Sequence, residues 1–344
     1  MGRSQVAVSH QRKAPMDQKF NLSDVRNTRN LLSDYVIQTP VHQLHSPAIS
    51  RLLGSQSQVY LKLELFQHTG TFKVRGAINS ALNLPSEKVK NGFTAVSAGN
   101  HAIATAFTAK TLETTSKVVM IKTANQLRVA KCREYGGEIV FADDAHSAFD
   151  LVEEIQRKEG YSFLHPFEGR NVSLGTATLG LEFSEQVDNL DAVVVAIGGG
   201  GLASGVSMAI KELKAKCQVY GVEPEGADTM RRSFQTGKPE SVDQVNTIAD
   251  SLGAPYALDN SFALCRKYID DLVLVSDQEM VNAMALLLSE TKLVVEPAGA
   301  ASLAAVLAPL RSRLFNKRIG LIVCGSNIDL SSFKTLIDSA VAFQ

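Results

Sequence analysis

The stretch LELFQHTGTFKVRGAINS, residues 63–80, contains Lys73 directly after a Thr-Gly-Thr turn and at the start of a small, apolar, helix-like run. An isolated lysine is usually a solvated surface group with a high pKa. This lysine instead stands among Phe72, Val74 and Gly76. Such surroundings lower the pKa of an amine and free it for Schiff-base chemistry. Lys73 is therefore a candidate for covalent chemistry, with a solvated surface group as the alternative.

Four consecutive glycines, Gly198 to Gly201 in VVVAIGGGGLASG, follow an apolar run and open a helix-like stretch. Such a turn presents unpaired backbone N–H groups and a positive helix end to an anion, which predicts a phosphate site. A tight turn is the alternative, although it requires fewer glycines. GGGGLA also fits the dinucleotide pattern GxGxxA with Glu223 as the ribose-binding acid, so a nicotinamide-dependent dehydrogenase is a rival interpretation. A dehydrogenase leaves Lys73 without a role, whereas a phosphate-anchored aldehyde cofactor needs one lysine.

A second strand-to-helix turn, AVSAGNHA at residues 95–102, combines Ser97, Asn100 and the start of a predicted helix. These groups could hold a carboxylate through several hydrogen bonds. The alternative is an ordinary helix N-cap, in which Ser97 or Asn100 satisfies the first helical N–H groups. His101, taken singly, is better explained as a positioning residue than as a base.

Short runs rich in valine and isoleucine, each followed by helical spacing, divide the chain into two α/β series. The first contains FTAVSA, SKVVMIK and GEIVFAD, with helices expected from about Asn100, Ala124 and Ala145. The second contains DAVVVAI, CQVYGVE, DLVLVS and RIGLIVCG. Apolar runs without alternation are typical of buried parallel strands in βαβ units. We therefore predict two open α/β sheets, with ligand sites beyond the carboxyl ends of their strands.

The composition excludes several classes of protein. The 344 residues carry 35 Lys and Arg against 35 Asp and Glu, without a basic stripe, which disfavours nucleic-acid binding. No apolar run approaches the ~20 residues of a membrane span, and residues 1–20 are a polar stretch that we interpret as a mobile tail. We expect a soluble, cytoplasmic protein. Four widely separated cysteines lack the spacing of a zinc site or a disulfide framework: Cys132, Cys217, Cys265 and Cys324.

Five segments in order, LELFQHTGTFKVRGA, VSAGNHA, GGGGLASG, VEPAGAA and VCGSNID, resemble the fold-type II pyridoxal-phosphate enzymes. The resemblance is to the threonine/serine dehydratase and serine racemase branch and covers residues 35–335. It implies a tryptophan synthase β-like fold of two three-layer α/β domains with open, mostly parallel sheets. Residues 21–90 and 167–344 would form a large cofactor-binding domain, and residues 91–166 a small mobile domain. Homodimers are expected by the same resemblance.

The resemblance also implies roles for individual residues. Lys73 would form the Schiff base with pyridoxal 5′-phosphate, Phe72 would pack beside its ring, and Asn100 would lie near its 3′-oxygen. Glu296 would lie close to the ring, and Cys324 would face the pyridine nitrogen. The phosphate would be bound by the backbone of Gly198, Gly199, Gly200, Gly201 and Leu202. The substrate carboxylate would be received by Ser97, Asn100 and His101.

The implied reaction is β-elimination from a β-hydroxy amino acid, giving a 2-oxo acid and ammonia. L-Threonine is the expected substrate, followed by L-serine. A neutral thiol at Cys324 makes the ring a weaker electron sink than a carboxylate partner would, which suits elimination. Serine racemase and hydroxyaspartate dehydratase are the related alternatives. Racemases of this branch carry a second serine that acts as a base, and Ala98 occupies that place here.

Further departures from the family pattern concern a cation and the substrate pocket. A Mg²⁺ site near VEPEGAD would use Glu223 and the Ala227 carbonyl, but Thr229 stands where an aspartate is expected. Ser251 replaces a usual glycine, and Phe167 and Leu174 stand at positions that are often polar. The last two predict a pocket that is apolar around the β-substituent, which suits threonine or a bulkier β-hydroxy amino acid. The strands and turns that carry these residues must therefore converge on one pocket.

Overall fold

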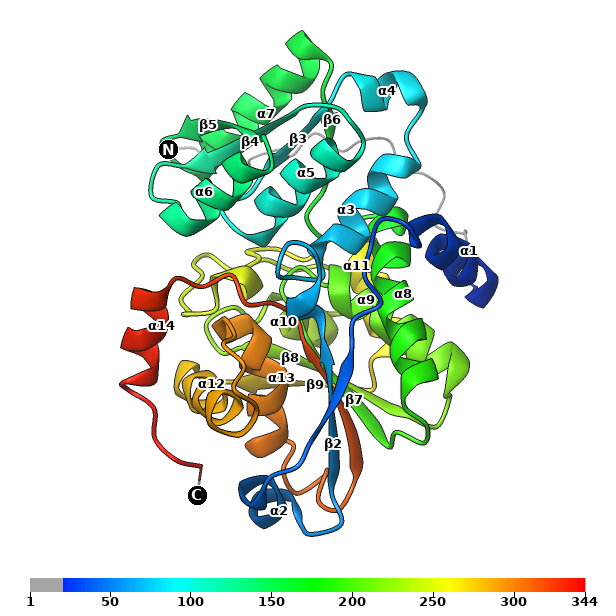
Figure 1. Ribbon diagram of the computed structural model, residues 1–344, viewed down its shortest axis with the longest axis vertical. Coiled ribbons are helices and arrows are strands. Elements are labelled where there is room, and N and C mark those ends of the chain that lie inside the picture. The colour runs from blue at the N-terminus through cyan, green and yellow to red at the C-terminus, as the bar shows by residue number, and fades with distance from the viewer. Residues whose placement is uncertain (1–20, 344) are drawn as a thin grey trace.

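The computed structural model describes residues 21–343, so the predicted mobile tail, residues 1–20, lies outside the described residues. Two sheets form two lobes, one above the other in Figure 1. The larger sheet has the strand order β1-β2-β10-β7-β8-β9. Only β1 runs antiparallel to its neighbour in this sheet. Its strands are β1 (Val41–Leu44), β2 (Gln58–Leu63), β7 (Ala192–Ala196), β8 (Gln218–Pro224), β9 (Asp271–Val275) and β10 (Arg318–Val323).

The smaller sheet has the order β5-β4-β3-β6, and all of its strands are parallel. Val118 and Met120 of β4 pack with α5 and α6, whereas Val119 packs with α7. Successive side chains of a strand point to opposite faces, so helices cover both faces of this sheet. The elements are β3 (Phe93–Val96), β4 (Ser116–Ile121), β5 (Glu138–Ala142) and β6 (Ser162–Phe163), with α5 (Asn100–Thr111), α6 (Gln126–Glu134) and α7 (Ala145–Glu159).

Helices also cover both faces of the larger sheet, so the predicted α/β fold with mostly parallel sheets is confirmed (Figure 1). On one side lie α12 (Asp277–Thr291) and α13 (Pro297–Leu307), and on the other α8 (Arg170–Gln186), α9 (Gly201–Leu213) and α11 (Asp259–Tyr268). The remaining helices are α1 (Leu22–Leu32), α2 (Pro47–Leu53), α3 (Lys73–Leu82), α4 (Ser86–Lys90), α10 (Thr229–Thr236) and α14 (Leu330–Ile337), with 3₁₀ turns η1 (Glu64–Phe66) and η2 (Asp250–Leu252).

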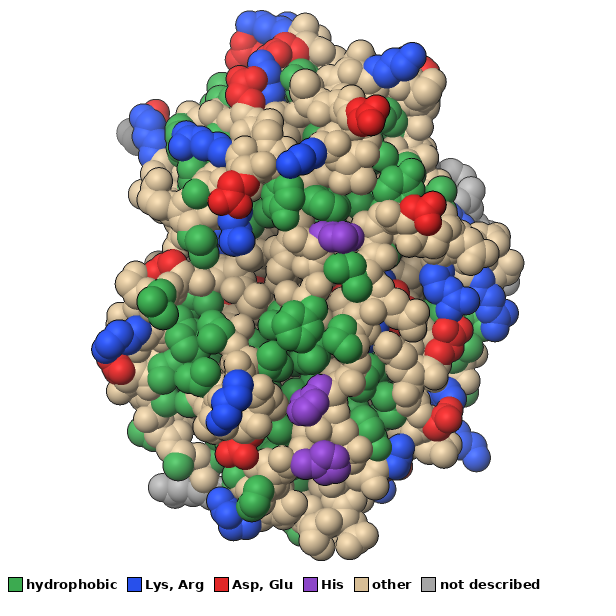
Figure 2. Space-filling view, in the orientation of Figure 1, with side chains coloured by type: hydrophobic (Ala, Val, Ile, Leu, Met, Phe, Trp, Pro, Cys, Tyr) green, Lys and Arg blue, Asp and Glu red, His purple; other side chains and the backbone are tan. Residues whose placement is uncertain are grey.

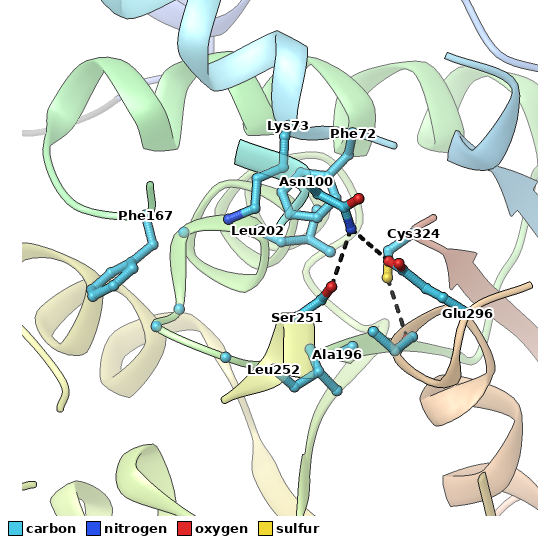
Figure 3. A pocket seen from close by; sticks show the side chains of 15 residues that line it. Phe72, Lys73, Asn100, Phe167, Ala196, Leu202, Ser251, Leu252, Glu296 and Cys324 are labelled. Atoms are coloured by element: carbon cyan, nitrogen blue, oxygen red, sulfur yellow. Dashed lines mark hydrogen bonds between the residues drawn. The ribbon is translucent and has the colours of Figure 1, made fainter. Parts of the chain in front are cut away.

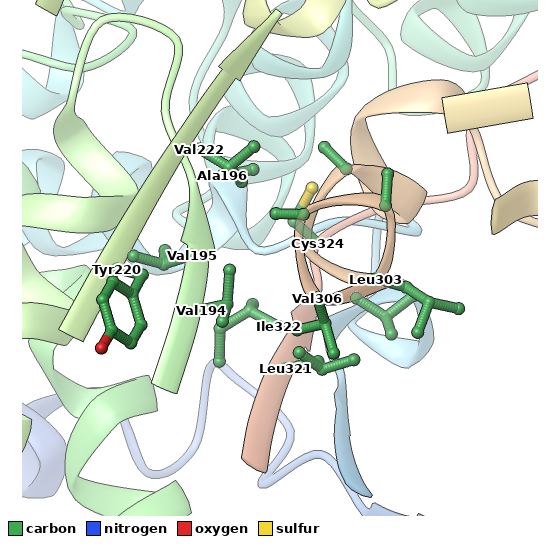
Figure 4. Packing of buried hydrophobic residues seen from close by; sticks show 14 of the residues in the cluster. Val194, Val195, Ala196, Tyr220, Val222, Leu303, Val306, Leu321, Ile322 and Cys324 are labelled. Carbon is green, nitrogen blue, oxygen red and sulfur yellow. The ribbon is translucent and has the colours of Figure 1, made fainter. Parts of the chain in front are cut away.

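The main core lies between β7, β8, β10 and α13 (Figure 4). Val194 and Ile322 are fully buried on the sheet and face Val306 of the helix. Alanine and glycine in PAGAASLAAVL let α13 approach the sheet closely, because they project little side chain from the helix. The rigid sheet that results holds the ends of β7 and β10, where the site residues begin.

Local sequence sets where the helices begin. Asp144 and Ser147 form a reciprocal capping box at α7, and Ser276 and Glu279 form another at α12. Helix α6 begins at Gln126 rather than near Ala124, because the side chain of Asn125 accepts a hydrogen bond from the Leu127 amide.

The four strands of the smaller sheet all lie within residues 93–163. The mobility and bounds predicted for a domain of residues 91–166 stay a prediction. Charged side chains of both signs are interspersed on the face shown in Figure 2, and apolar side chains gather near its middle. Among residues 21–343, no helix is both long and apolar enough to cross a membrane.

Candidate active site

One pocket lies at the carboxyl ends of β3, β7 and β10, where the rule for open α/β sheets places ligand sites (Figure 3). It has about 410 Å³ of empty space, including space open to solvent at its mouth. All of the predicted cofactor-binding residues line it. The pocket is lined by Phe72, Lys73, Asn100, Phe167, Ala196, Gly198, Gly199, Gly200, Gly201, Leu202, Ser251, Leu252, Glu296, Ala298 and Cys324.

Lys73 is the first residue of α3, and its side chain enters the pocket. Its Nζ donates a hydrogen bond to the Pro166 carbonyl at 2.7 Å and lies 5.3 Å from the centre of the Phe72 ring. Removal from water lowers the pKa of this amine to about 8. Burial, together with the Lys73 charge, lowers the pKa of His101 to about 3 and that of His165 to about 4. Both imidazoles are therefore neutral near pH 7, so neither can serve there as an imidazolium general acid.

The glycine loop is shaped by the Phe167 side chain. A Cβ built on Gly199 would lie 2.2 Å from the Phe167 ring, and one on Gly201 would lie 2.6 Å from the Phe167 carbonyl oxygen. Gly200 has a φ of 91°, in the left-handed region that favours glycine. Within residues 21–343, the N–H groups of Gly198 through Leu202 have no hydrogen-bond acceptor. The loop thus offers several unpaired donors at the N-terminus of α9, as an anion site requires.

The second predicted turn is only partly exposed to the pocket. Asn100 lines it, but Ser97 and His101 do not. Ser97 Oγ accepts a hydrogen bond from the Gly99 amide at 3.1 Å, and His101 Nε2 lies 2.7 Å from the Leu164 carbonyl oxygen. No side chain caps α5, so its first N–H groups are available to a carboxylate. The carboxylate-binding role assigned to the three side chains stays a prediction.

Cys324 and Glu296 lie side by side at one end of the pocket (Figure 3). The Cys324 thiol donates to the Ala298 carbonyl at 3.3 Å, and burial raises its pKa, so the sulfur is neutral. Burial also raises the pKa of Glu296 to about 7. The backbone joins this end to the lysine, because the Phe72 amide donates to the Cys324 carbonyl at 3.3 Å.

Sequence reasoning missed an ion pair that joins the two lobes next to the pocket. Arg128 of α6 is 7 % exposed and bonds both carboxylate oxygens of Asp250 in η2. Its Nη2 also lies 3.5 Å from a carboxylate oxygen of Glu296. Arg128 and Asp250 lie 122 positions apart in the chain, and no local pattern in the sequence links them.

Two residues that the sequence singled out, Glu223 and Leu174, do not line the pocket. Glu223 is fully buried, and its carboxylate oxygens accept hydrogen bonds from the Met230 and Arg231 amides at the start of α10, each at 2.8 Å. No group of three or more His, Cys, Asp or Glu side chains that could hold a metal occurs within residues 21–343, and the Mg²⁺ site at Glu223 and Ala227 stays a prediction. Leu174 does not line the pocket and packs against Val25 of α1, so its expected place beside a substrate is wrong.

The pocket fits a phosphorylated aldehyde cofactor. It combines a partly neutral lysine amine with a loop whose unpaired N–H groups suit a phosphate. Phe72 supplies an aromatic surface in the same pocket. A nicotinamide cofactor would use Glu223, which is instead bonded to α10 and lies outside the pocket lining.

The chain belongs to the family of pyridoxal-phosphate dependent enzymes, whose model matches residues 32–325. Pyridoxal phosphate is its cofactor. The chain is 48% identical to a phenylserine dehydratase of Ralstonia pickettii over 91% of this chain and 95% of that protein. It is 35% identical to an L-threonine ammonia-lyase of Thermotoga maritima, over 94% and 79% of the two chains. The fold is similar to that of maize serine racemase, with a TM-score of 0.86 and 34% identity over 92% and 96% of the chains.

Proposed function

We propose that this protein is a pyridoxal-phosphate dependent ammonia-lyase that converts a 3-hydroxy amino acid into a 2-oxo acid and ammonia. The observation that carries the proposal is the meeting of Lys73 with the unpaired N–H groups of Gly198 to Leu202 in one pocket. Similarity to a dehydratase and to an ammonia-lyase over most of the chain supports it. Location in the cytoplasm and assembly into a homodimer remain expectations from the sequence.

Each group of the pocket has a distinct task in this reaction. The N–H groups of the glycine loop would hold the phosphate, and Lys73 would carry the covalent bond to the cofactor. Pyridoxal phosphate, when bound, supplies an electron sink for negative charge at the substrate Cα. Lys73 would be freed when the substrate amine takes its place in that bond. With a pKa of about 8, its amine is partly neutral near pH 7 and could then accept the Cα proton at Nζ. The 3-hydroxyl leaves as water, and later hydrolysis returns one water, so the net loss is ammonia.

We further propose that the preferred substrate carries an apolar β-substituent, with a 3-aryl-3-hydroxy amino acid ahead of threonine and serine. The higher identity to the phenylserine dehydratase than to the threonine ammonia-lyase favours this order. Within the described residues, Lys73 and Glu296 are the only charged side chains in the pocket lining. The neighbouring Arg128 is already paired with Asp250, so a second carboxylate, as in 3-hydroxyaspartate, meets no unpaired cation there.

The test begins with an absorption spectrum of the purified protein, followed by kcat/KM for phenylserine, threonine, serine and 3-hydroxyaspartate. We expect a visible Schiff-base band, lost in Lys73→Ala, and release of 2-oxo acids in the order of that panel. Chiral analysis of the remaining amino acid measures racemisation in parallel. We expect little, because Ala98 packs beside the α5–α6 cluster and presents no hydroxyl base.

Racemisation without oxo-acid release would refute the lyase assignment while keeping the cofactor. A clear preference for 3-hydroxyaspartate would refute the apolar pocket while keeping the lyase. A preference for threonine over phenylserine would return the assignment to the order expected from the sequence.

A further inference from the structure

Asn327, in the loop between β10 and α14, bonds a pocket residue without lining the pocket itself. Its side chain is 5 % exposed. Nδ2 donates to the Asn100 side-chain oxygen and to the Thr69 carbonyl oxygen, each at 2.8 Å. Thr69 is the first residue of the Thr-Gly-Thr turn that leads into Lys73. Asn327 therefore joins the loop before α3 to the first residue of α5.

The Asn100 amide is held by partners from three separate segments. Its Oδ1 accepts from Asn327, and its Nδ2 donates to Glu296 at 2.6 Å and to Ser251 at 3.2 Å (Figure 3). One acceptor position and both N–H donors are thus in use. Such a fully connected set fixes the amide in one orientation.

A half-turn of this amide would be unfavourable at both ends. Its oxygen would then face the Glu296 carboxylate oxygen, and its NH₂ group would face the NH₂ group of Asn327. Glu296 alone can select the orientation only while its carboxylate accepts a hydrogen bond. Asn327 supplies a neutral donor at the other end of the amide, which selects the same orientation without using a charge.

We propose that Asn327 is a positioning residue, which acts through Asn100 to keep an amide N–H directed into the pocket toward the cofactor and substrate oxygens. Of the two hydrogen bonds that Asn100 Nδ2 donates, the one to Ser251 is the longer. Its N–H is therefore the one that most readily turns to a ligand oxygen instead. The inference rests on the proposed function, because the orientation of Asn100 matters only where the pocket holds its cofactor and substrate.

The experiment is a double-mutant cycle on the full-length protein with Asn327→Ala, Asn100→Ala and both changes together. Two quantities are measured for each variant: the Kd for pyridoxal phosphate, from the Schiff-base absorbance on titration, and the melting temperature without cofactor. Asn79→Ala is the matched control, because Asn79 is also buried and donates to a backbone carbonyl, that of Asn171 at 2.7 Å, away from the pocket. Asn79→Ala should lower the melting temperature and leave the Kd unchanged.

We expect Asn327→Ala to raise the Kd about 10-fold, the usual effect of leaving one buried polar group unpaired. In the Asn100→Ala background the same change should have little further effect on the Kd. Asn327→Asp provides a second variant of the same shape in case the alanine protein does not fold. Its carboxylate replaces a donor by an acceptor and favours the turned amide of Asn100, so its Kd should rise at least as far.

Effects on the Kd that multiply independently in the double variant would overturn the proposal, since Asn327 would then act without Asn100. A folded Asn327→Asp protein with the wild-type Kd would overturn it as well. Because the double-mutant cycle measures the Kd for pyridoxal phosphate, it can still be interpreted if the wild-type protein binds the cofactor and releases no oxo acid. That last result would refute the proposed reaction alone.

Discussion

Glu296→Gln should change how the stability of the cofactor-free protein depends on pH. Glu296 is 2 % exposed, and burial raises its pKa from an ordinary 4.5 to about 7. The folded protein therefore keeps this proton up to about pH 7, whereas the unfolded chain releases it near pH 4.5. Between these values the folded state binds more protons, so the free energy of unfolding falls as pH rises. The shift of 7 − 4.5 = 2.5 units corresponds to a loss of about 3 kcal/mol that is complete above pH 7.

Glutamine does not titrate, so the variant lacks this loss. Its side-chain oxygen can keep the hydrogen bond from Asn100, while its NH₂ group faces Arg128, a cost that does not change with pH. The stability of the variant relative to wild type should therefore improve by about 2.5 kcal/mol between about pH 5 and about pH 8, since the first part of the loss occurs below pH 5. Urea unfolding at several pH values measures this difference, and other titrating groups cancel from it. Glu185→Gln, which removes an exposed carboxylate paired with Arg29, is the control. Parallel curves for wild type and Glu296→Gln would refute the reasoning.

Two further predictions concern the lysine and the glycine loop. The rate at which the cofactor-free protein captures pyridoxal phosphate should rise with pH, with a midpoint near pH 8, because only the neutral Lys73 amine reacts and its pKa is lowered to about 8. At pH 7 this pKa gives about 300-fold more neutral amine than an ordinary lysine has. Stopped-flow absorbance measures the midpoint, and a value near 10.5 would contradict the burial argument. Gly199→Ala should lower the free energy of unfolding by about 1–3 kcal/mol and weaken cofactor binding, because its Cβ would meet the Phe167 ring. Adding Phe167→Leu should restore part of the free energy of unfolding, measured by urea unfolding, and part of the cofactor affinity, measured by titration. A Gly199→Ala protein with wild-type stability and affinity would show that the Phe167 ring is not the obstacle.

Local patterns in the sequence were sufficient for the features that depend on neighbouring residues. The strand that ends at Ala196 and the glycine loop after it are contiguous, so their order predicts the turn and its donors. The position of Lys73 after a Thr-Gly-Thr turn is local in the same way. By contrast, β1 and β2 were not predicted, because VHQL and QVYLKL mix polar and apolar residues in short runs that resemble other segments.

Contacts between distant segments could not be obtained in this way. Leu174 was expected beside the substrate because it stands at a position that is often polar in the family that the sequence resembles. The helical period instead turns Leu174 toward Val25 of α1, whose position no pattern in the sequence specifies. The role of Asn327 was hidden for a related reason: it belongs to VCGSNID, but its partner Asn100 is 227 positions away.

The two cations of FKVR, Lys73 and Arg75, show how the fold separates catalytic charge from structural charge. Arg75 is fully buried and bonds Glu64 at 2.8 Å and Glu182 at 2.7 Å. Burial alone would lower the pKa of Arg75, but these carboxylates hold it above its ordinary value. Lys62 bonds Glu182 at 2.7 Å, so two buried cations meet two buried anions.

Such a balanced network is costly to desolvate, and its benefit is a fixed arrangement rather than added stability. It ties the first turn of α3 to η1 and α8 through bidentate geometry that a lysine at position 75 would not reproduce. Lys73, two residues earlier on the same turn, has no carboxylate within hydrogen-bond distance in the described residues and donates only to a carbonyl. The ion pairs of Arg75 can thus hold the helix in place while the Lys73 amine stays uncommitted, which is the condition under which burial lowers its pKa instead of fixing its charge.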